Sequence, residues 1–219
     1  MAQTSGVNSD LKVRLAALAK SGNKTASGAR IAATNFLNKL YSSTGFKVAW
    51  SNPANVEALK SAVSRSWEDG LLPSDFHFSH LTSPATGTSD DAAIDRDLIM
   101  SDALARLLYQ LYFGKVSPNA LDPNWNFSRP VLSSDPVQIV ADALAQGKVQ
   151  DLIDKARLKH PLYAGLKASL QAYTQIAANG GWTAMPDGPA IKPGAQDPRL
   201  AQLRARLAVT GESAGGTVA

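Results

Sequence analysis

The stretch DRDLIMSDALARLLYQLYFG, residues 95–114, decides the fold of this chain. It predicts one helix, and large apolar residues lie on nearly every side of it: Leu98, Ile99, Met100, Leu104, Leu107, Leu108, Leu111, Tyr112 and Phe113. A helix that is apolar almost all round is buried rather than laid on a surface. Gly114 suits its end, since glycine takes a left-handed backbone without cost. We therefore expect a buried central helix.

Four polar residues form the one stripe of this helix that we expect to face water: Asp95, Asp102, Arg106 and Gln110. Asp102 and Arg106 are spaced as a favourable i,i+4 ion pair. A run of about 20 residues is long enough to cross a membrane. This pair and the charges at residues 96–97 would be costly in lipid, so no membrane span is predicted.

Helical periodicity continues on both sides of the central helix. It predicts helices over residues 8–20, 27–42 and 53–67 before it, and over 135–146, 149–156, 161–179 and 198–207 after it. Asn52-Pro53 and Asp135-Pro136 are typical N-cap and N1 pairs. No pair of strands and no internal repeat is visible. The predicted fold class is all-α, a single irregular multi-helix domain of about eight helices around the buried central helix.

Glycine and proline mark the predicted domain boundaries. A helical domain is expected over residues 1–181, where Gly180-Gly181 ends the helix over 161–179. Residues 182–211 are predicted to be a Pro/Gly-rich linker followed by the last helix. Residues 212–219 are small and Gly-rich, and we expect this tail to be disordered.

The chain has 219 residues and no cysteine. This length can bury a core without metal or disulfide, and the lack of cysteine excludes thiolate metal sites and cysteine nucleophiles. The opening MAQTSGVNSD has neither a basic start nor an apolar core, so no signal peptide is predicted. The sequence therefore indicates either a cytosolic protein or a chain from which a leader has been removed or trimmed.

Positive charge is concentrated in the first third of the chain. The net charge is +4, of which residues 1–60 contribute +6 and the remainder −2. A basic segment can meet a polyanion, which leaves open a helical adaptor or nucleic-acid-binding domain. It can equally be the solvated face of a helix pair. Against nucleic acid, the basic residues are widely spaced and no stacking aromatics lie beside them.

Residues that could carry chemistry are few. His77 and His80 are spaced i,i+3, but zinc would need a third ligand and none is suitably spaced. Glu68 and Asp69 are adjacent, so their carboxylates point to different sides of a helix. A hydrolase would need an acid and a base or nucleophile in a cleft, and Glu68 is the only glutamate in a motif-like setting. No catalytic residue, no metal site and no cofactor is predicted.

Short motifs occur along the chain in a defined order. They are Leu40-Tyr41, Phe46, Trp50, Asp69-Gly70-Leu71, Pro73, Asp75-Phe76-His77, Asp95, Asp97-Leu98, Ser101-Asp102-Ala103, Gly114-Lys115-Val116, Pro118, Trp125, His160-Pro161, Tyr163, Tyr173, Gly180-Gly181-Trp182, Lys192-Pro193-Gly194, Asp197-Pro198, Leu203-Arg204, Arg206-Leu207 and Gly211. This ordered set resembles the scaffold region of large periplasmic L,D-transpeptidases of Gram-negative bacteria. One departure is Leu158, where that family often has proline.

The resemblance implies a part in peptidoglycan cross-linking. In that family a separate C-terminal domain carries a nucleophilic cysteine, which this chain does not contain, so no catalytic residue can be transferred. We expect a non-catalytic scaffold fragment that positions a missing catalytic domain and contacts peptidoglycan or cell-wall synthesis proteins, not nucleic acid. Residues 182–211 then resemble the truncated start of a peptidoglycan-binding module, and the implied compartment is the periplasm.

Side-chain positions can also be predicted. Trp182, Arg199, Arg204 and Arg206 are the candidate binding residues for peptidoglycan or a partner, with the three arginines facing outward. We expect Leu98, Leu107, Leu108 and Leu111 to be fully buried. We expect Trp50, Trp67 and Trp125 to be largely buried, and Tyr41 and Tyr173 to lie in one core. The leucine stripe of the last helix is expected to fold back, with Trp182 as its anchor.

Overall fold

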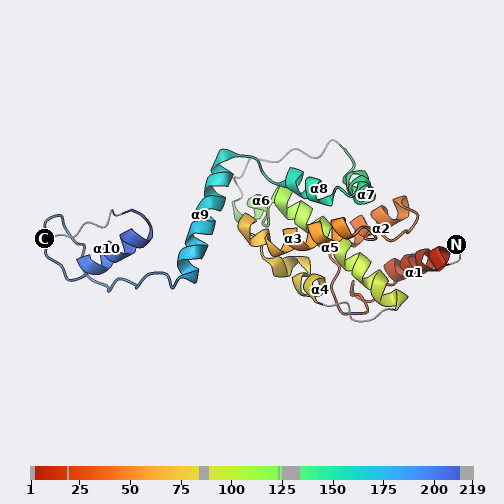
Figure 1. Cartoon of the computed structure of the whole chain (residues 1–219), viewed down its shortest axis with the longest axis horizontal. Coiled ribbons are helices and arrows are strands. Elements are labelled where there is room, and N and C mark those ends of the chain that lie inside the picture. The colour runs from red at the N-terminus through yellow and green to blue at the C-terminus, as the bar shows by residue number, and fades with distance from the viewer. Residues whose placement is uncertain (1–2, 19, 84–88, 123, 125–133, 213–219) are drawn as a thin grey trace. The chain divides into compact units, whose positions relative to one another are not determined.

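The computed structural model describes residues 3–18, 20–83, 89–122, 124 and 134–212. The chain is all-α, as the sequence predicts. Within the described residues the order is α1 (Gln3–Leu18), α2 (Thr34–Ser43), α3 (Pro53–Ser64), η1 (Ser66–Asp69), η2 (Pro73–Phe76), α4 (Phe78–Thr82), α5 (Asp90–Phe113), α6 (Pro118–Leu121), α7 (Pro136–Gln146), α8 (Val149–Ala156), α9 (Pro161–Ala178) and α10 (Leu200–Val209) (Figure 1). The helices beyond the expected eight are the short α4 and α6.

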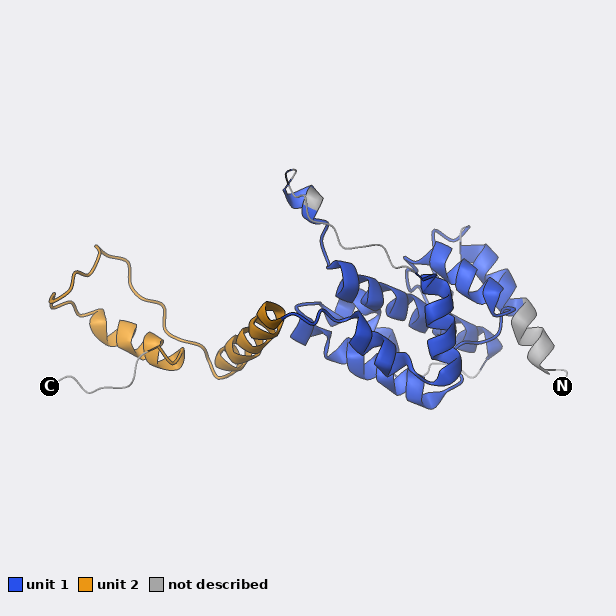
Figure 2. Cartoon of the chain, turned by 90° about the horizontal axis from the view of Figure 1, so that it is seen from above, with its two compact units in different colours: residues 1–160 blue, residues 161–219 orange. Residues whose placement is uncertain are grey.

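The chain forms two compact units, Met1–His160 (unit 1) and Pro161–Ala219 (unit 2) (Figure 2). The division falls between α8 and α9. The predicted boundaries at Gly181 and Gly211 therefore do not coincide with it and stay predictions. The predicted disordered tail lies outside the described residues, apart from Glu212.

The central helix is α5, and it is longer than its apolar stretch predicts. Ser89 caps its start by accepting a hydrogen bond from the Ala92 amide, and Asp90 and Asp91 complement the helix dipole in the first turn. Gly114 ends it with a φ of 93°. In unit 1 this helix contacts α1, α2, α3, α4, α8 and η2 (Figure 1).

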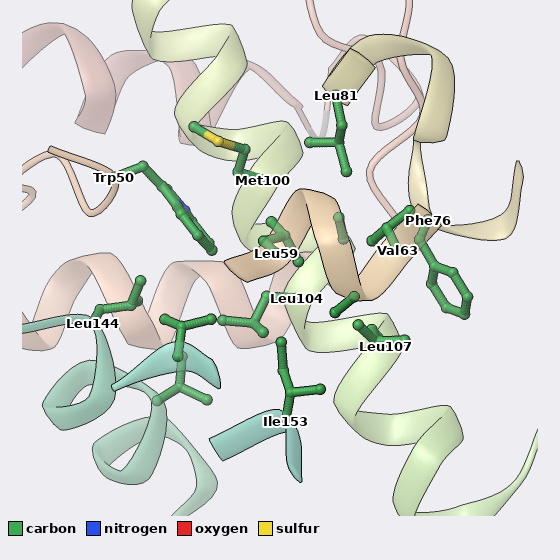
Figure 3. Close-up of a cluster of buried hydrophobic side chains, with 14 of the residues drawn as sticks. Trp50, Leu59, Val63, Phe76, Leu81, Met100, Leu104, Leu107, Leu144 and Ile153 are labelled. Atoms are coloured by element: carbon green, nitrogen blue, oxygen red, sulfur yellow. The ribbon is translucent and has the colours of Figure 1, made fainter. Parts of the chain in front are cut away.

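Two clusters of buried apolar side chains surround α5. One lies against its first turns and includes Leu11, Leu37, Tyr41, Ile94 and Leu98. The other lies against its later turns, where side chains of α3, α5, α7 and α8 converge (Figure 3). The second cluster includes Trp50, Leu59, Phe76, Leu104, Leu107, Leu144 and Ile153. Burial of this apolar area is the main stabilising contribution to unit 1.

Two predicted helix starts are confirmed by their caps. Asn52 accepts a hydrogen bond from the Ala54 amide at 2.9 Å and starts α3. Asp135 does the same for Val137 at the start of α7. In contrast, the helix predicted from Ser27 begins only at Thr34. Residues 20–33 form turns instead, with an isolated bridge between Lys24 and Arg30.

Several burial predictions need correction. Leu98, Leu107 and Leu111 are buried, but Leu108 is only partly buried against the second cluster. Trp50 is buried, whereas Trp67 is 38% exposed because it lies in η1 at the end of α3. Trp125 lies outside the described residues.

Tyr41 and Tyr173 were expected to share one core, and this is wrong. Tyr41 lies in the core of unit 1 with no exposed surface. Tyr173 belongs to α9 in unit 2 and is 49% exposed.

Candidate functional site

The polar stripe of α5 is buried, which corrects the expectation that it faces water. Asp95, Asp97, Ser101 and Asp102 are all buried. Gln110 and Arg106 are partly buried. The stripe is covered because residues 25–33 and 46–50, which do not form helices, pack over it. Five backbone amides of these segments, those of Ser27, Ala32, Ala33, Ala49 and Trp50, donate to aspartates of this helix.

Asp102 is a junction for three segments. Its Oδ1 accepts hydrogen bonds from the backbone amides of Ala32 at 2.8 Å and Ala33 at 2.7 Å, just before α2. Its Oδ2 lies 2.8 Å from Nε2 of His77. The predicted partner, Arg106, is further away, with Nη1 3.8 Å from Oδ2. The sequence thus identified the weakest of the contacts of Asp102.

Asp97 holds the link between α2 and α3. Its carboxylate accepts hydrogen bonds from the amides of Ala49 and Trp50 at 3.0–3.1 Å and from the Tyr41 hydroxyl at 2.5 Å. Ser101 Oγ completes the group, 2.7 Å from Tyr41 Oη, and accepts from Trp50 Nε1 at 2.9 Å. This group connects one turn of α5 to two segments that come 47 to 60 residues earlier.

Burial shifts the pKa of both titratable members of this group. Desolvation raises the pKa of Asp97, although the hydrogen bonds from Tyr41, Ala49 and Trp50 lower it in part. Desolvation, and next the charge of Asp97, raise the pKa of Tyr41 well above its ordinary value of 10.0. At neutral pH Tyr41 therefore stays protonated and remains a donor.

Asp95 has one carboxylate oxygen satisfied and one not. Its Oδ2 accepts a hydrogen bond from the Ser27 amide at 2.9 Å. Its Oδ1 is buried, and none of the described atoms donates to it. Asp95 and Asp102 are seven residues apart on one face of α5, so both receive amides from the segment before α2.

The two histidines do not form a metal site with other ligands. His77 takes a left-handed backbone with a φ of 57° between η2 and α4. Its ring meets that of His80 edge to face at 5.9 Å. The described residues contain no group of three potential metal ligands. His77 instead connects the turn between η2 and α4 to Asp102 on α5.

All four predicted binding residues belong to unit 2, and two of them, Trp182 and Arg206, are in contact. The Trp182 ring contacts Tyr173 of α9 edge to face at 6.2 Å, and the Arg206 guanidinium lies 4.8 Å from its centroid. Trp182 is 36% exposed, so part of its ring stays accessible. Arg206, which was expected to face outward, is exposed, and its guanidinium also lies over this ring. Trp182 thus links the last two helices of unit 2.

Arg199 is held by its own segment. Its Nε and Nη2 donate to the two carboxylate oxygens of Asp197 at 3.0 and 2.7 Å, and Nη2 also donates to the Pro189 carbonyl at 2.7 Å. These hydrogen bonds lower the pKa of Asp197 to about 2. The expectation that Arg199 is free for a ligand is wrong, since its donors close the loop before α10. Arg204 is exposed.

The leucine stripe of the last helix is partly buried within unit 2. Leu200, Leu203 and Leu207 are each intermediate in exposure. Asp197 accepts a hydrogen bond from the Arg199 amide at 2.9 Å, but α10 itself begins at Leu200. Among the described helices, none is long and apolar enough to span a membrane.

Sequence reasoning did not identify the buried carboxylates as a site. One signal was available: an otherwise apolar helix carried three aspartates and a serine within residues 95–102, and the ordered motifs contained all four. A helix buried on every side cannot keep such a stripe in water. Their partners could not be read from the sequence because they lie 25 to 70 residues away.

Comparison with known proteins gives one match. A family model described as Scaffold domain matches residues 35–170, more than half of the chain. The match begins in α2, contains all of α5 and ends within α9. No curated protein and no solved structure matches the chain.

Proposed function

Because the chain belongs to the Scaffold domain family, we propose that it is the scaffold part of an L,D-transpeptidase that cross-links peptidoglycan in the periplasm. The observation that carries the proposal is the match over residues 35–170 together with the motifs that resemble those enzymes. The scaffold itself is non-catalytic in this proposal. It holds a catalytic domain in place and contacts the cell wall or a cell-wall synthesis protein.

The positions of the motif residues support a structural role for this domain rather than a catalytic one. Tyr41, Trp50, Asp97 and Ser101 form one buried hydrogen-bonded group, and His77 and Asp102 form another. Each fixes a backbone segment against α5. Satisfied buried networks of this kind rigidify a core. A rigid unit suits a domain whose task is to orient a second one.

Acyl transfer by this enzyme class needs an activated thiol. The chain has no cysteine, so in this proposal the chemistry belongs to another part of the parent protein. The buried carboxylates of α5 are held by backbone amides and by Tyr41 and His77. They serve the fold, and no acid–base role is assigned to them.

In unit 2, Trp182 and Arg204 are suited to peptidoglycan. The exposed part of an indole ring can stack on a sugar face, and a guanidinium can pair with stem-peptide carboxylates. Trp182 is held by Tyr173 and Arg206, which orders the ring before binding. Arg204 lies on the same helix as Arg206. We assign these two side chains the binding role, with Arg206 as the residue that positions the ring.

Co-sedimentation with purified sacculi tests the binding role. The full chain should pellet with sacculi at low salt, and Trp182→Ala or Arg204→Glu should lower the bound fraction about tenfold. Lys20→Glu, which changes an exposed charge in unit 1, is the matched control and should bind as the wild type does. If no protein sediments with the sacculi at low salt, the proposed binding to the cell wall is wrong.

The basic N-terminal third was the basis of the alternative, a nucleic-acid-binding domain. Arg14 pairs with Asp91 at 2.9 Å and Lys60 with Glu57 at 3.2 Å. Lys12 lies over the Phe46 ring at 5.5 Å. Asp91, which lies outside this third, thus offsets one of its positive charges, and the other two contacts occupy Lys60 and Lys12, so no observation favours the alternative. Binding to duplex DNA that weakens steeply with salt would revive it.

A further inference from the structure

An apolar groove runs along the second half of α5 in unit 1. It has a volume of about 620 Å³ and is walled by α2, α5, α7 and α8. Apolar side chains that form it include Phe36, Leu108, Tyr112, Phe113, Ile139 and Leu152. Its volume lies in the range of pockets that hold a ligand or the anchor side chains of a partner.

Aromatic side chains at one end of this groove are exposed. Tyr109 is 62% exposed and Phe113 39% exposed, and their ring centroids lie 5.0 Å apart. Tyr112 contacts Phe113 edge to face at 4.8 Å. Clustered exposed aromatics next to an apolar groove are typical of interaction surfaces, where they become the residues that contribute most to affinity.

The charge of the groove has one sign. Among the described residues that line it, Arg106 and Lys155 are charged and none is acidic. Arg106 also pairs with Asp102, whose Oδ2 lies 3.8 Å from Nη1, but 29% of the Arg106 side chain stays exposed, whereas that of Asp102 is buried. The groove also contains Gln110, whose buried Oε1 accepts no hydrogen bond from any described residue.

We propose that this groove binds an amphipathic helix of a separate protein, whose apolar face carries residues at i, i+4 and i+7 and whose edges carry aspartate or glutamate. A groove between helices is filled well by the side-chain ridge of another helix. The apolar residues would pack on Leu108, Tyr109 and Phe113. The acidic residues would pair with Arg106 and Lys155. This proposal is independent of the cell-wall role.

Charge argues against the exposed helices of this chain as the occupant. The sequence of α9, PLYAGLKASLQAYTQIAA, contains Lys167 and no acid. The sequence of α10, LAQLRARLAV, contains Arg204 and Arg206 and likewise lacks an acidic residue. Either helix, in the same or a second copy, would bring like charge toward Arg106 and Lys155. Complementarity therefore selects an acidic partner.

A pair of synthetic helical peptides tests the proposal on the full chain by fluorescence anisotropy. Both carry leucines at i, i+4 and i+7; one has glutamates on its flanks and the other has lysines. The glutamate peptide should bind at least about tenfold more tightly, and raising the salt concentration should narrow the difference. Lys155→Glu should weaken its binding about tenfold and favour the lysine peptide. Tyr109→Ala, at an exposed position, should weaken both.

Lys148→Glu is the matched control, since it reverses an exposed charge that precedes the same helix, α8, but does not line the groove. It should leave both affinities unchanged. If the two peptides bind equally, or if Lys155→Glu has no effect on binding, the inference that the partner is acidic is wrong. Binding of neither peptide would overturn the proposal. Slow chemical modification of Tyr109 in the free protein would then identify this chain itself as the cover of the groove.

Discussion

Nε2 of His77 lies 2.8 Å from Oδ2 of Asp102, and both side chains are buried. The left-handed backbone of His77 turns the chain between η2 and α4. The hydrogen bond of its ring to Asp102 holds this turn against the middle of α5. The same carboxylate holds the amides of Ala32 and Ala33. The Asp102 carboxylate thus holds two separate segments, both of which precede α5 in the sequence.

Asp102→Ala should destabilise unit 1 by about 3–5 kcal/mol, because it leaves a buried imidazole and two partly buried amide hydrogen bonds without their acceptor. Chemical denaturation followed by circular dichroism measures this loss. Asp142→Ala is the control, since Asp142 is exposed on α7 and pairs only with Gln138. It should change stability by less than about 0.5 kcal/mol. Equal effects of the two variants would contradict the junction role of Asp102.

Tyr41 should make unit 1 lose stability in alkali. Its pKa is raised above 10.0 in the folded chain, so the unfolded state loses this proton first. The stabilising contribution is therefore complete below pH 10 and is lost as the pH rises through the folded pKa. The difference in unfolding free energy between wild type and Tyr41→Phe should narrow above about pH 10. Tyr109→Phe, at an exposed ring, should leave the pH dependence unchanged.

Leu107→Ala should cost about 2–5 kcal/mol, because its side chain is buried in the second cluster and truncation leaves a cavity. Leu108→Ala should cost clearly less, since Leu108 is only partly buried and lines the open groove. Urea denaturation of the two variants gives the comparison directly. Equal losses would mean that Leu108 is covered in solution.

Gly147→Ala should destabilise more than Gly45→Ala does. Both glycines have left-handed φ values, 72° and 65°, so both substitutions carry the same backbone strain. A Cβ on Gly147 would also lie 2.9 Å from Nδ2 of Asn52. A Cβ on Gly45 would have no described atom within 4 Å outside its chain neighbours. Displacing Asn52 would break the cap of α3, which adds about 1 kcal/mol. Thermal unfolding of both variants separates the two contributions.

Amides of residues 198–208 should be protected from hydrogen exchange, because Trp182 connects α10 to Tyr173 of α9. Trp182→Ala should speed exchange in this stretch, as measured by mass spectrometry. Trp67→Ala, in unit 1, should have no such effect. Exchange of the wild-type stretch within seconds would show that α10 does not dock.

The sequence was informative where structure depends on neighbours in the chain. Asn52-Pro53 and Asp135-Pro136 gave correct helix starts because a cap bonds an amide two residues away. The apolar pattern around Leu98 and Leu107 correctly predicted the buried helix. These features need no knowledge of distant residues.

Prediction failed where a distant residue decides the outcome. Residues 27–33 have a helical pattern, yet three of their amides, those of Ser27, Ala32 and Ala33, bond to Asp95 and Asp102 on α5. Arg199 was expected to be free, but Asp197 and the Pro189 carbonyl bind it. Local charge and hydropathy do not reveal such pairings.

The hydrogen bonds of α5 also impose an order on folding. Ala32 and Ala33 find their acceptor 69 and 70 residues later in the chain, and Trp50 finds its acceptor 47 residues later. Contacts of such long range slow folding relative to simple helical bundles. On a ribosome that adds about 5–20 residues per second, the segment before α2 waits between about 4 and 14 seconds for Asp102. During that interval the amides of Ala32 and Ala33 lack the carboxylate that accepts their hydrogen bonds in the folded chain.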